Sequence, residues 1–204
     1  SGKDPKFKAF FDLNLIARKV AELSLTPAII GQDGFLTTHL IESALLPERE
    51  LVAEYLGKPD DLIDTPTPAQ QMLYGPKRRR VPAIWDVDTP LLSGSVQNQD
   101  AYMQATAGQR PYFFDHIEAL ADLCMDEYAG LTGRRYQLFD YVGHPEAERV
   151  VVVMGSGAEV THELVEVLAA KGEKVGVLKV RLFRPWKAEA FLAALPKSVK
   201  SIAV

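Results

Sequence analysis

The chain is poor in several features that would point to particular classes of protein. Its single cysteine, Cys124, excludes a disulfide within the chain, and also an iron–sulfur cluster held by it, which needs about four thiolates. The sequence has no run of about 18 apolar residues, which a membrane-spanning helix would need, so no membrane partner is expected. It also shows no charged-then-apolar leader of the kind that directs secretion. The net charge of −4 argues against nucleic acid as the main partner. We therefore expect a cytoplasmic protein.

The clearest pattern lies between Arg149 and Val204, where apolar runs alternate with segments of helical spacing. We expect strands at 150–153, 175–182 and 199–204, separated by helices at 158–170 and 187–195. Val150 to Val153 is a continuous β-branched run, typical of a strand that is buried on both faces. The alternation predicts right-handed crossovers, and so the α/β class with a parallel sheet and flanking helices.

A glycine turn, Gly155-Ser156-Gly157, follows the first of these strands and resembles part of a dinucleotide site. The third glycine of that fingerprint is missing, because position 160 is valine. The next strand ends in Lys179 and Arg181 rather than in an acid that would hold a ribose. We interpret the turn as structural, with anion binding at Gly155, Ser156 and Gly157 as the alternative.

The region before the sheet is less regular. Helices are expected at 7–23, 47–56 and 112–133, with a short strand at 28–30. Residues 57–109 are rich in proline and poor in periodicity, which is typical of a segment that wraps a surface or binds something. We expect one domain over 1–140 and a second over 141–204.

Two polar groups are candidates for a substrate channel. Thr37, Thr38 and His39 follow the Asp-Gly turn at the end of the expected strand 28–30, and ligands of open α/β sheets gather at such ends. They either orient a substrate or cap a helix. Gln97 and Asn98 lie between a glycine and an aromatic residue, where they either contact a ligand or satisfy loop backbone.

Two charged groups have a plainer interpretation. Glu159 and His162, with Glu163 and Glu166, resemble a metal-binding helix, but no second Glu-x-x-His occurs, so we expect a solvated acidic face. The basic run 77–80 either holds a phosphate-bearing ligand such as coenzyme A or forms salt bridges with acidic neighbours, which are Asp60, Asp61 and Asp64. No catalytic residue and no metal site is predicted, and Cys124 is expected to be buried and inert.

Several motifs together resemble those of one known family. Asp33-Gly34-Phe35 with Thr37-Thr38-His39 resembles a D-G-F-x-T-S-H stretch, and the run 94–100 resembles a G-x-x-Q-N-x-D loop. The stretches 141–149 and 154–204, including MGSGAE and GEKVGVLKVRLFRPW, are similar to a domain that resembles the C-terminal domain of transketolase, and the stretch 131–141 is similar to the segment leading into that domain. These matches run from about residue 10 to the last residue in the order found in the pyruvate:ferredoxin (flavodoxin) oxidoreductase family.

The resemblance implies a piece of a larger enzyme that oxidatively decarboxylates a 2-oxoacid, pyruvate above all, and transfers the acyl group to coenzyme A. Residues 1–140 would be the rear part of its thiamine-pyrimidine α/β domain, and 141–204 the start of the transketolase-like domain. Thiamine diphosphate, Mg²⁺, [4Fe-4S] clusters and coenzyme A would belong to the parent enzyme, none of them held by this piece alone. Ferredoxin or flavodoxin would accept the electrons, and a homodimer is expected.

One departure from the family pattern bears on the substrate. Where members specific for pyruvate often read D-G-F-R-T-S-H-E, this chain has Leu36, Thr38 and Leu40 in place of the arginine, serine and glutamate. Because two charges are lost, the substrate could also be a larger or more apolar 2-oxoacid than pyruvate. We expect this piece to serve mainly in architecture and subunit contact. The alternatives are a non-catalytic interaction module and a small anion- or nucleotide-binding domain.

Overall fold

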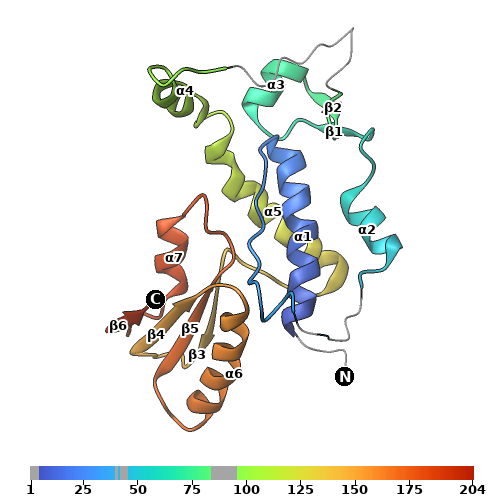
Figure 1. The fold of residues 1–204 in the computed structure, drawn as a ribbon. Coiled ribbons are helices and arrows are strands. Elements are labelled where there is room, and N and C mark those ends of the chain that lie inside the picture. The colour runs from blue at the N-terminus through green and yellow to red at the C-terminus, as the bar shows by residue number, and fades with distance from the viewer. Residues whose placement is uncertain (1–4, 40, 42–45, 84–95) are drawn as a thin grey trace. The chain divides into compact units, whose positions relative to one another are not determined.

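A computed structural model of the chain describes residues 5–39, 41, 46–83 and 96–204, and the side chains from residue 9 onward within these ranges. The chain forms two compact units (Figure 1). The first draws on residues up to Asn14, 29–46 and 132–204, and the second on 15–28 and 47–131. Helix α1 (Pro5–Ser24) contributes to both. No helix in the described ranges is long and apolar enough to cross a membrane.

The first unit contains a four-stranded mixed sheet with helices against it, which confirms the α/β class. Its strands are β3 (Phe139–Gly143), β4 (Arg149–Val153), β5 (Val175–Val180) and β6 (Ser201–Ala203), in the order β3-β5-β4-β6. β4 pairs in parallel with β5 and β6, as expected for the three predicted strands, whereas β3, which was not predicted, adds an antiparallel strand beside β5 at one edge. Only residues 144–148 separate β3 from β4. Such a link is too short for the crossover that parallel strands need, so the chain reverses direction.

The helices of this unit are α6 (Ser156–Ala170), between β4 and β5, and α7 (Ala188–Ala194), between β5 and β6. Val177 and Leu178 of β5 point to opposite faces, and both are completely buried. In β4, Val150 and Val152 are buried, but Val151 is 38% exposed. The expectation that 150–153 is buried on both faces is therefore wrong. The reason is that α6 packs mainly over β5 and β3.

The second unit is mostly helical. It contains the end of α1, then α2 (Arg49–Leu56), β1 (Leu62–Asp64), α3 (Pro68–Tyr74), β2 (Lys77–Arg79), α4 (Tyr102–Gln109), the 3₁₀ turn η1 (Phe114–His116) and α5 (Ile117–Thr132). Tyr55 and Tyr128 meet edge to face at 4.9 Å in its core, and the Tyr55 hydroxyl donates to the carbonyl of Cys124. The prolines between residues 57 and 83 lie beside or within short helices and strands. Thr67 caps α3 and Pro68 occupies its first turn, so the lack of periodicity did not mean a lack of regular structure.

Two sequence expectations about strands and cysteine have clear outcomes. Residues 28–30 form no strand, because no neighbouring strand pairs with them, and Ile29 is almost fully exposed. Cys124 is completely buried, as predicted, and burial raises the pKa of its thiol to about 12. The thiolate is the reactive form, so the native protein holds this residue in an inert state.

Arg78 of β2 ties the two-stranded sheet β1–β2 to the C-terminal end of α1. Its guanidinium donates to the carbonyls of Glu22 at 2.8 Å and Leu23 at 3.3 Å, and to Oε1 of Gln70 at 2.7 Å. A cation at this end of a helix satisfies terminal carbonyls and complements the dipole. The basic run thus differs from a simple salt-bridged loop. Lys77 does pair with Asp64 at 3.3 Å, but Arg78 is 4% exposed and serves the backbone.

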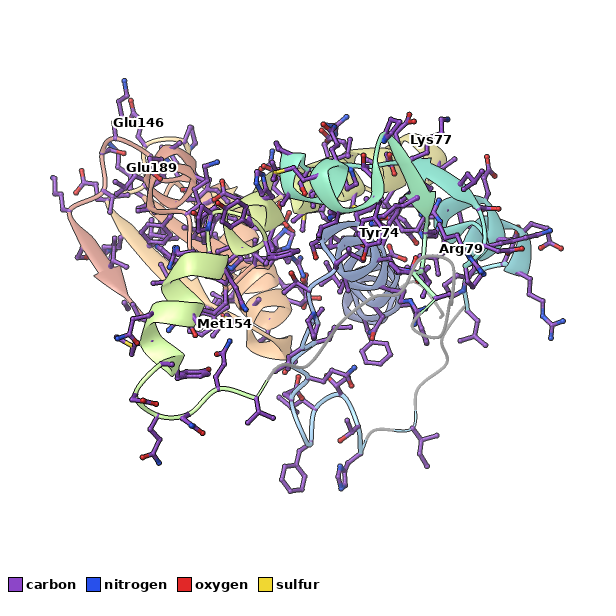
Figure 2. All side chains as sticks on the ribbon, turned by 90° about the horizontal axis from the view of Figure 1, so that it is seen from above. Tyr74, Lys77, Arg79, Glu146, Met154 and Glu189 are labelled. Carbon is purple, nitrogen blue, oxygen red and sulfur yellow. The ribbon has the colours of Figure 1, made fainter. Side chains whose placement is uncertain are left out.

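We predict that Arg78→Met destabilises the second unit by about 3 kcal/mol, because it removes the donor to the Glu22 carbonyl and to Oε1 of the buried Gln70. Arg79→Met is the matched control, since Arg79 and Lys77 leave the same strand at the surface (Figure 2). Cys124, the chain's single cysteine, reports the opening of this unit through its labelling by a thiol reagent. Labelling should accelerate on the order of a hundredfold in Arg78→Met and little in Arg79→Met. Equal rates in the two variants would contradict this role for Arg78.

Candidate functional site at the carboxyl ends of β4 and β5

The glycine turn after β4 belongs partly to α6 itself. Helix α6 begins at Ser156, two residues earlier than the sequence pattern indicated, and Gly155 is its N-cap with φ +69°. This left-handed conformation favours glycine. Gly155 has no side chain to cap the helix, so the first amides of α6 need an acceptor from elsewhere. Ser156 and Gly157 lie in the first turn.

That acceptor is Asp33, which is 123 residues away in the sequence. Its Oδ2 accepts a hydrogen bond from the Ser156 amide at 3.3 Å and another from the Thr37 hydroxyl at 2.8 Å. One carboxylate therefore joins two groups that the sequence suggested separately, the Gly155–Gly157 turn and the Thr37–His39 loop. Asp33 itself was missed, because it was interpreted only as part of an Asp-Gly turn.

The remaining polar side chains of this loop bond within the loop. The hydroxyl of Thr38 donates to the carbonyl of Gly34, and Nδ1 of His39 lies 2.7 Å from the same oxygen. The rings of Phe35 and His39 are in contact, with centroids 4.8 Å apart and planes tilted by 37°. Thr38 and His39 are exposed, so they form a folded corner that faces solvent.

Behind the turn, Glu159 occupies the centre of a charged network. Its carboxylate accepts from Lys179 of β5 at 2.8 Å and from Arg181 at 3.2 Å. Arg181 also donates to Asp140 of β3 at 3.1 Å, so the network links α6 to two strands. The side chains of Lys179 and Glu159 are only 6% and 14% exposed. The expectation of a solvated acidic face is thus wrong at Glu159, because cations from the sheet face this part of α6.

The electrostatic balance differs between the two carboxylates of this network. Burial acts to raise the pKa of Glu159, but the hydrogen bonds and charges of Lys179 and Arg181 outweigh burial, so the pKa lies below its usual value. For Asp140, burial outweighs the attraction of Arg181, and the pKa is raised. Glu159 is therefore the firmly ionised partner of both cations.

His162 extends the network along α6. Its Nδ1 lies 2.7 Å from Nζ of Lys179, and its Nε2 lies 3.2 Å from Oε1 of Glu166. An ammonium can only donate, so Nδ1 accepts, and Nε2 carries the proton toward Glu166. Within the described ranges no group of three metal-ligating side chains is present, and His162 bonds to an ammonium rather than facing an open cavity.

The other substrate-channel candidates belong to the second unit. Gln97 and Asn98 border an open hollow with Gln99 and Asp100. The carbonyl of Asn98 accepts from the amides of Ala101 and Tyr102, just before α4. Their part in ligand binding stays a prediction. Of the positions that depart from the family pattern, Leu36 is exposed and Leu40 lies outside the described residues.

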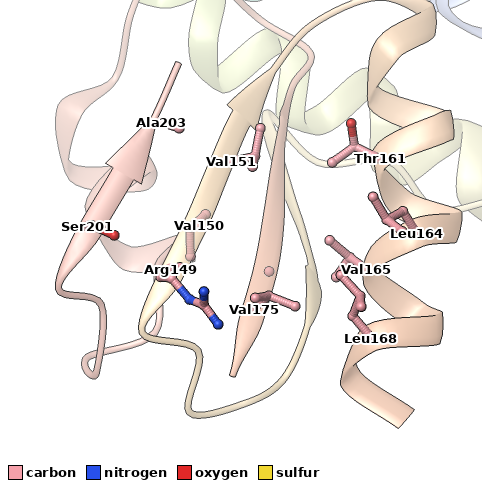
Figure 3. Close-up of a pocket in the computed structure, with 11 residues that line it drawn as sticks. Arg149, Val150, Val151, Thr161, Leu164, Val165, Leu168, Val175, Ser201 and Ala203 are labelled. Carbon is pink, nitrogen blue, oxygen red and sulfur yellow. The ribbon is translucent and has the colours of Figure 1, made fainter. Parts of the chain in front are cut away.

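An apolar groove of about 290 Å³ lies on the face of the sheet beside α6 (Figure 3). Its floor includes Val151 of β4 and Ala203 of β6, and its wall includes Leu164 and Leu168 of α6. The outer side of α6 adds three exposed apolar residues at helical spacing, which are Val160, Leu164 and Val167. This part of the unit therefore presents a continuous apolar surface.

Two models of known protein families match the chain. A family model described as the thiamine diphosphate-binding domain of pyruvate flavodoxin/ferredoxin oxidoreductase matches residues 6–124. The chain belongs to the pyruvate:ferredoxin/flavodoxin oxidoreductase family. A second model, pyruvate:ferredoxin oxidoreductase core domain II, matches residues 147–204, which contain β4, α6, β5, α7 and β6. The resemblance seen in the sequence is thus confirmed.

Relatives from several bacteria agree. The chain is 45% identical over 194 residues to the pyruvate-flavodoxin oxidoreductase of Rhodospirillum rubrum. The aligned stretch covers 95% of this chain and 15% of the relative. The chain is 40% identical over 193 residues to the pyruvate:ferredoxin oxidoreductase of Moorella thermoacetica, with the same coverage. A probable pyruvate-flavodoxin oxidoreductase of Escherichia coli is 36% identical over 196 residues. The chain thus spans about 15% of the length of these relatives, and corresponds to a part of such enzymes.

The start of α6 does not fit a thiamine diphosphate site. A diphosphate and its Mg²⁺ need anion donors and oxygen ligands grouped together. The N-terminus of α6 is filled by the carboxylate of Asp33, and the nearby cations Lys179 and Arg181 are paired with Glu159. The start of α6 therefore lacks the free donors that the diphosphate would need.

We predict that Glu159→Gln lowers the unfolding free energy of the first unit by about 3 kcal/mol at neutral pH, since it leaves Lys179 buried beside a neutral amide. The pKa of Glu159 is lower in the folded state, so its contribution is full above its usual value of 4.5 and is lost as the pH falls through the folded pKa. The acid-induced loss of stability should therefore be smaller in Glu159→Gln.

Urea unfolding in a Trp85→Phe background tests this, because Trp186 is then the sole tryptophan and packs against Phe139 of β3 at 4.8 Å. Glu163→Gln, an exposed glutamate on the same helix, is the matched control and should behave like the wild type. A wild-type pH dependence in Glu159→Gln would show that the network contributes nothing through this carboxylate.

Proposed function

We propose that this chain is part of a thiamine-dependent oxidoreductase that decarboxylates a 2-oxoacid, transfers the acyl group to coenzyme A and passes electrons to ferredoxin or flavodoxin. The observation that carries the proposal is the pair of family matches, to 6–124 and to 147–204, which cover two successive domains in one chain. Relatives named for pyruvate and for flavodoxin or ferredoxin support the substrate and the carriers.

The iron–sulfur clusters, Mg²⁺ and coenzyme A of such an enzyme would be held outside these residues. A chain with one cysteine supplies too few thiolates for a cluster, so other parts of the enzyme would carry the electrons. We place the enzyme in the cytoplasm, as a homodimer, with its domain boundary near residue 140. Thiamine diphosphate would supply the carbanion chemistry, and these residues would supply position and support.

The role of this piece is architecture and contact with the rest of the enzyme. The exposed apolar surface formed by Val151, Val160, Leu164 and Val167 supports this role, because parallel sheets are commonly covered on both faces. The occupant we infer is the remaining length of the same enzyme, since relatives are several times longer than the stretch matched here. An anion-binding role for Gly155–Gly157 has less support, because Asp33 already fills that position.

The protein that contains this sequence, purified from its native source, should reduce a viologen dye in the presence of pyruvate and coenzyme A, with both required. A branched-chain and an aryl 2-oxoacid are assayed in parallel, because Leu36 and Leu40 replace charged residues of the family pattern. The isolated 204-residue chain is the control and should be inactive. Failure of all three acids, with thiamine diphosphate and Mg²⁺ supplied, would reject the proposed function.

A further inference from the structure

Asp33 connects a surface loop to α6, the first helix of the transketolase-like domain. Its Oδ2 accepts from the Thr37 hydroxyl at 2.8 Å, which closes the loop, and from the Ser156 amide at 3.3 Å, which fixes the loop to α6. The same oxygen makes both contacts. The bond to Thr37 within the loop and the bond that attaches the loop to the helix therefore share one atom.

Among the described residues, the other polar contacts of the Thr38 and His39 side chains lie within the loop. The Thr38 hydroxyl and the His39 ring both bond to the carbonyl of Gly34. These bonds shape the corner but do not hold it to the sheet. The bond from Asp33 to Ser156 is the contact through which Thr38 and His39 are placed relative to α6.

The electrostatic setting favours a charged Asp33. The hydrogen bond from Thr37 is the main cause that lowers the pKa of its carboxyl, and the bond from Ser156 adds to it. A carboxylate at this end of α6 also complements the helix dipole. The other acid of the first turn, Glu159, is turned toward Lys179 and Arg181. Asp33 therefore acts as the cap that Gly155 cannot provide.

We propose that Asp33 is a positioning residue, which caps α6 from a distant loop and thereby fixes the Thr38–His39 corner to the transketolase-like domain. This inference rests on the proposed function, because the placement of that corner affects turnover only if the corner faces the path of the 2-oxoacid. The corner and the start of α6 then form one rigid element. Substrates would meet Thr38 and His39 in a fixed orientation.

Hydrogen exchange on the 204-residue protein tests the attachment without any assay of activity. In Asp33→Ala, amide exchange in a peptide that starts at Ser156 should be about five- to tenfold faster, the change expected for a lost N-cap. The exchange rate in Asp33→Asn should lie between those of the wild type and Asp33→Ala. The asparagine amide keeps an acceptor oxygen, but it places an NH₂ group where Oδ1 is buried without a partner. Gln32→Ala, an exposed neighbour, is the control. Unchanged exchange in Asp33→Ala overturns the proposal.

Kinetics of the whole enzyme test the positioning role. Asp33→Ala and Thr37→Val should raise the KM for the 2-oxoacid about tenfold with a smaller effect on kcat, because a displaced corner weakens the alignment of the substrate. Thr37→Ser keeps the hydroxyl donor and should restore the wild-type KM. A fall in kcat with unchanged KM, or no rescue by Thr37→Ser, overturns positioning. A wild-type enzyme that uses no 2-oxoacid would reject the proposed function, while the exchange result still decides whether Asp33 caps α6.

Discussion

The ion pair between Glu159 and Lys179 is the constraint on which the first unit depends. Both side chains are largely buried, at 2.8 Å from each other, and an unpaired charge in that position would be strongly unfavourable. The pair fixes the first turn of α6 against the end of β5. Arg181 then connects the same carboxylate to Asp140 of β3. The network therefore sets the helix against the antiparallel edge strand as well as against the strand that follows it in the sequence.

The network continues from the sheet to the start of the chain. Arg181 lies over the ring of Tyr136, at 5.6 Å from its centroid, and the Tyr136 hydroxyl donates to Asp12 of α1 at 2.7 Å. Arg134 binds both oxygens of that buried aspartate, at 2.6 Å and 3.0 Å. Paired guanidinium and carboxylate groups of this kind also fix orientation, because two parallel hydrogen bonds define a plane. Residues far apart in the sequence are thus held in one unit by charge as well as by apolar packing.

Sequence patterns predicted the elements well wherever the signal was local. The β-branched run at Val150–Val153 gave β4, and the helical spacing with its Lys171-Gly172 stop gave α6, because these depend on neighbours along the chain. Strand β3 was not predicted, since it forms only because the edge of β5 is available to pair with it. The prediction of a short strand at 28–30 was wrong for a similar reason, because an apolar run forms a strand only beside a partner strand.

The site shows the same division between local and distant causes. Cys124 was predicted to be inert from its apolar surroundings, and the structure confirms the burial that makes it so. The roles of Asp33 and Glu159 depended on partners many residues away, which no spacing rule reports. One sequence signal was available for Lys179, a lone cation inside an apolar strand, where a buried charge needs an acid nearby. Glu159, in the first turn of the preceding helix, was the acid within reach.

The glycine turn illustrates why a motif alone is a weak guide to function. A strand, a glycine and a helix N-terminus create a position that favours negative charge, whatever later occupies it. In a nucleotide-binding protein a phosphate fills the position, whereas here the carboxylate of Asp33 does so. The electrostatic preference that binds a ligand in one fold thus stabilises a loop in another. The deciding observation is the acceptor itself, and for this turn the chain supplies its own.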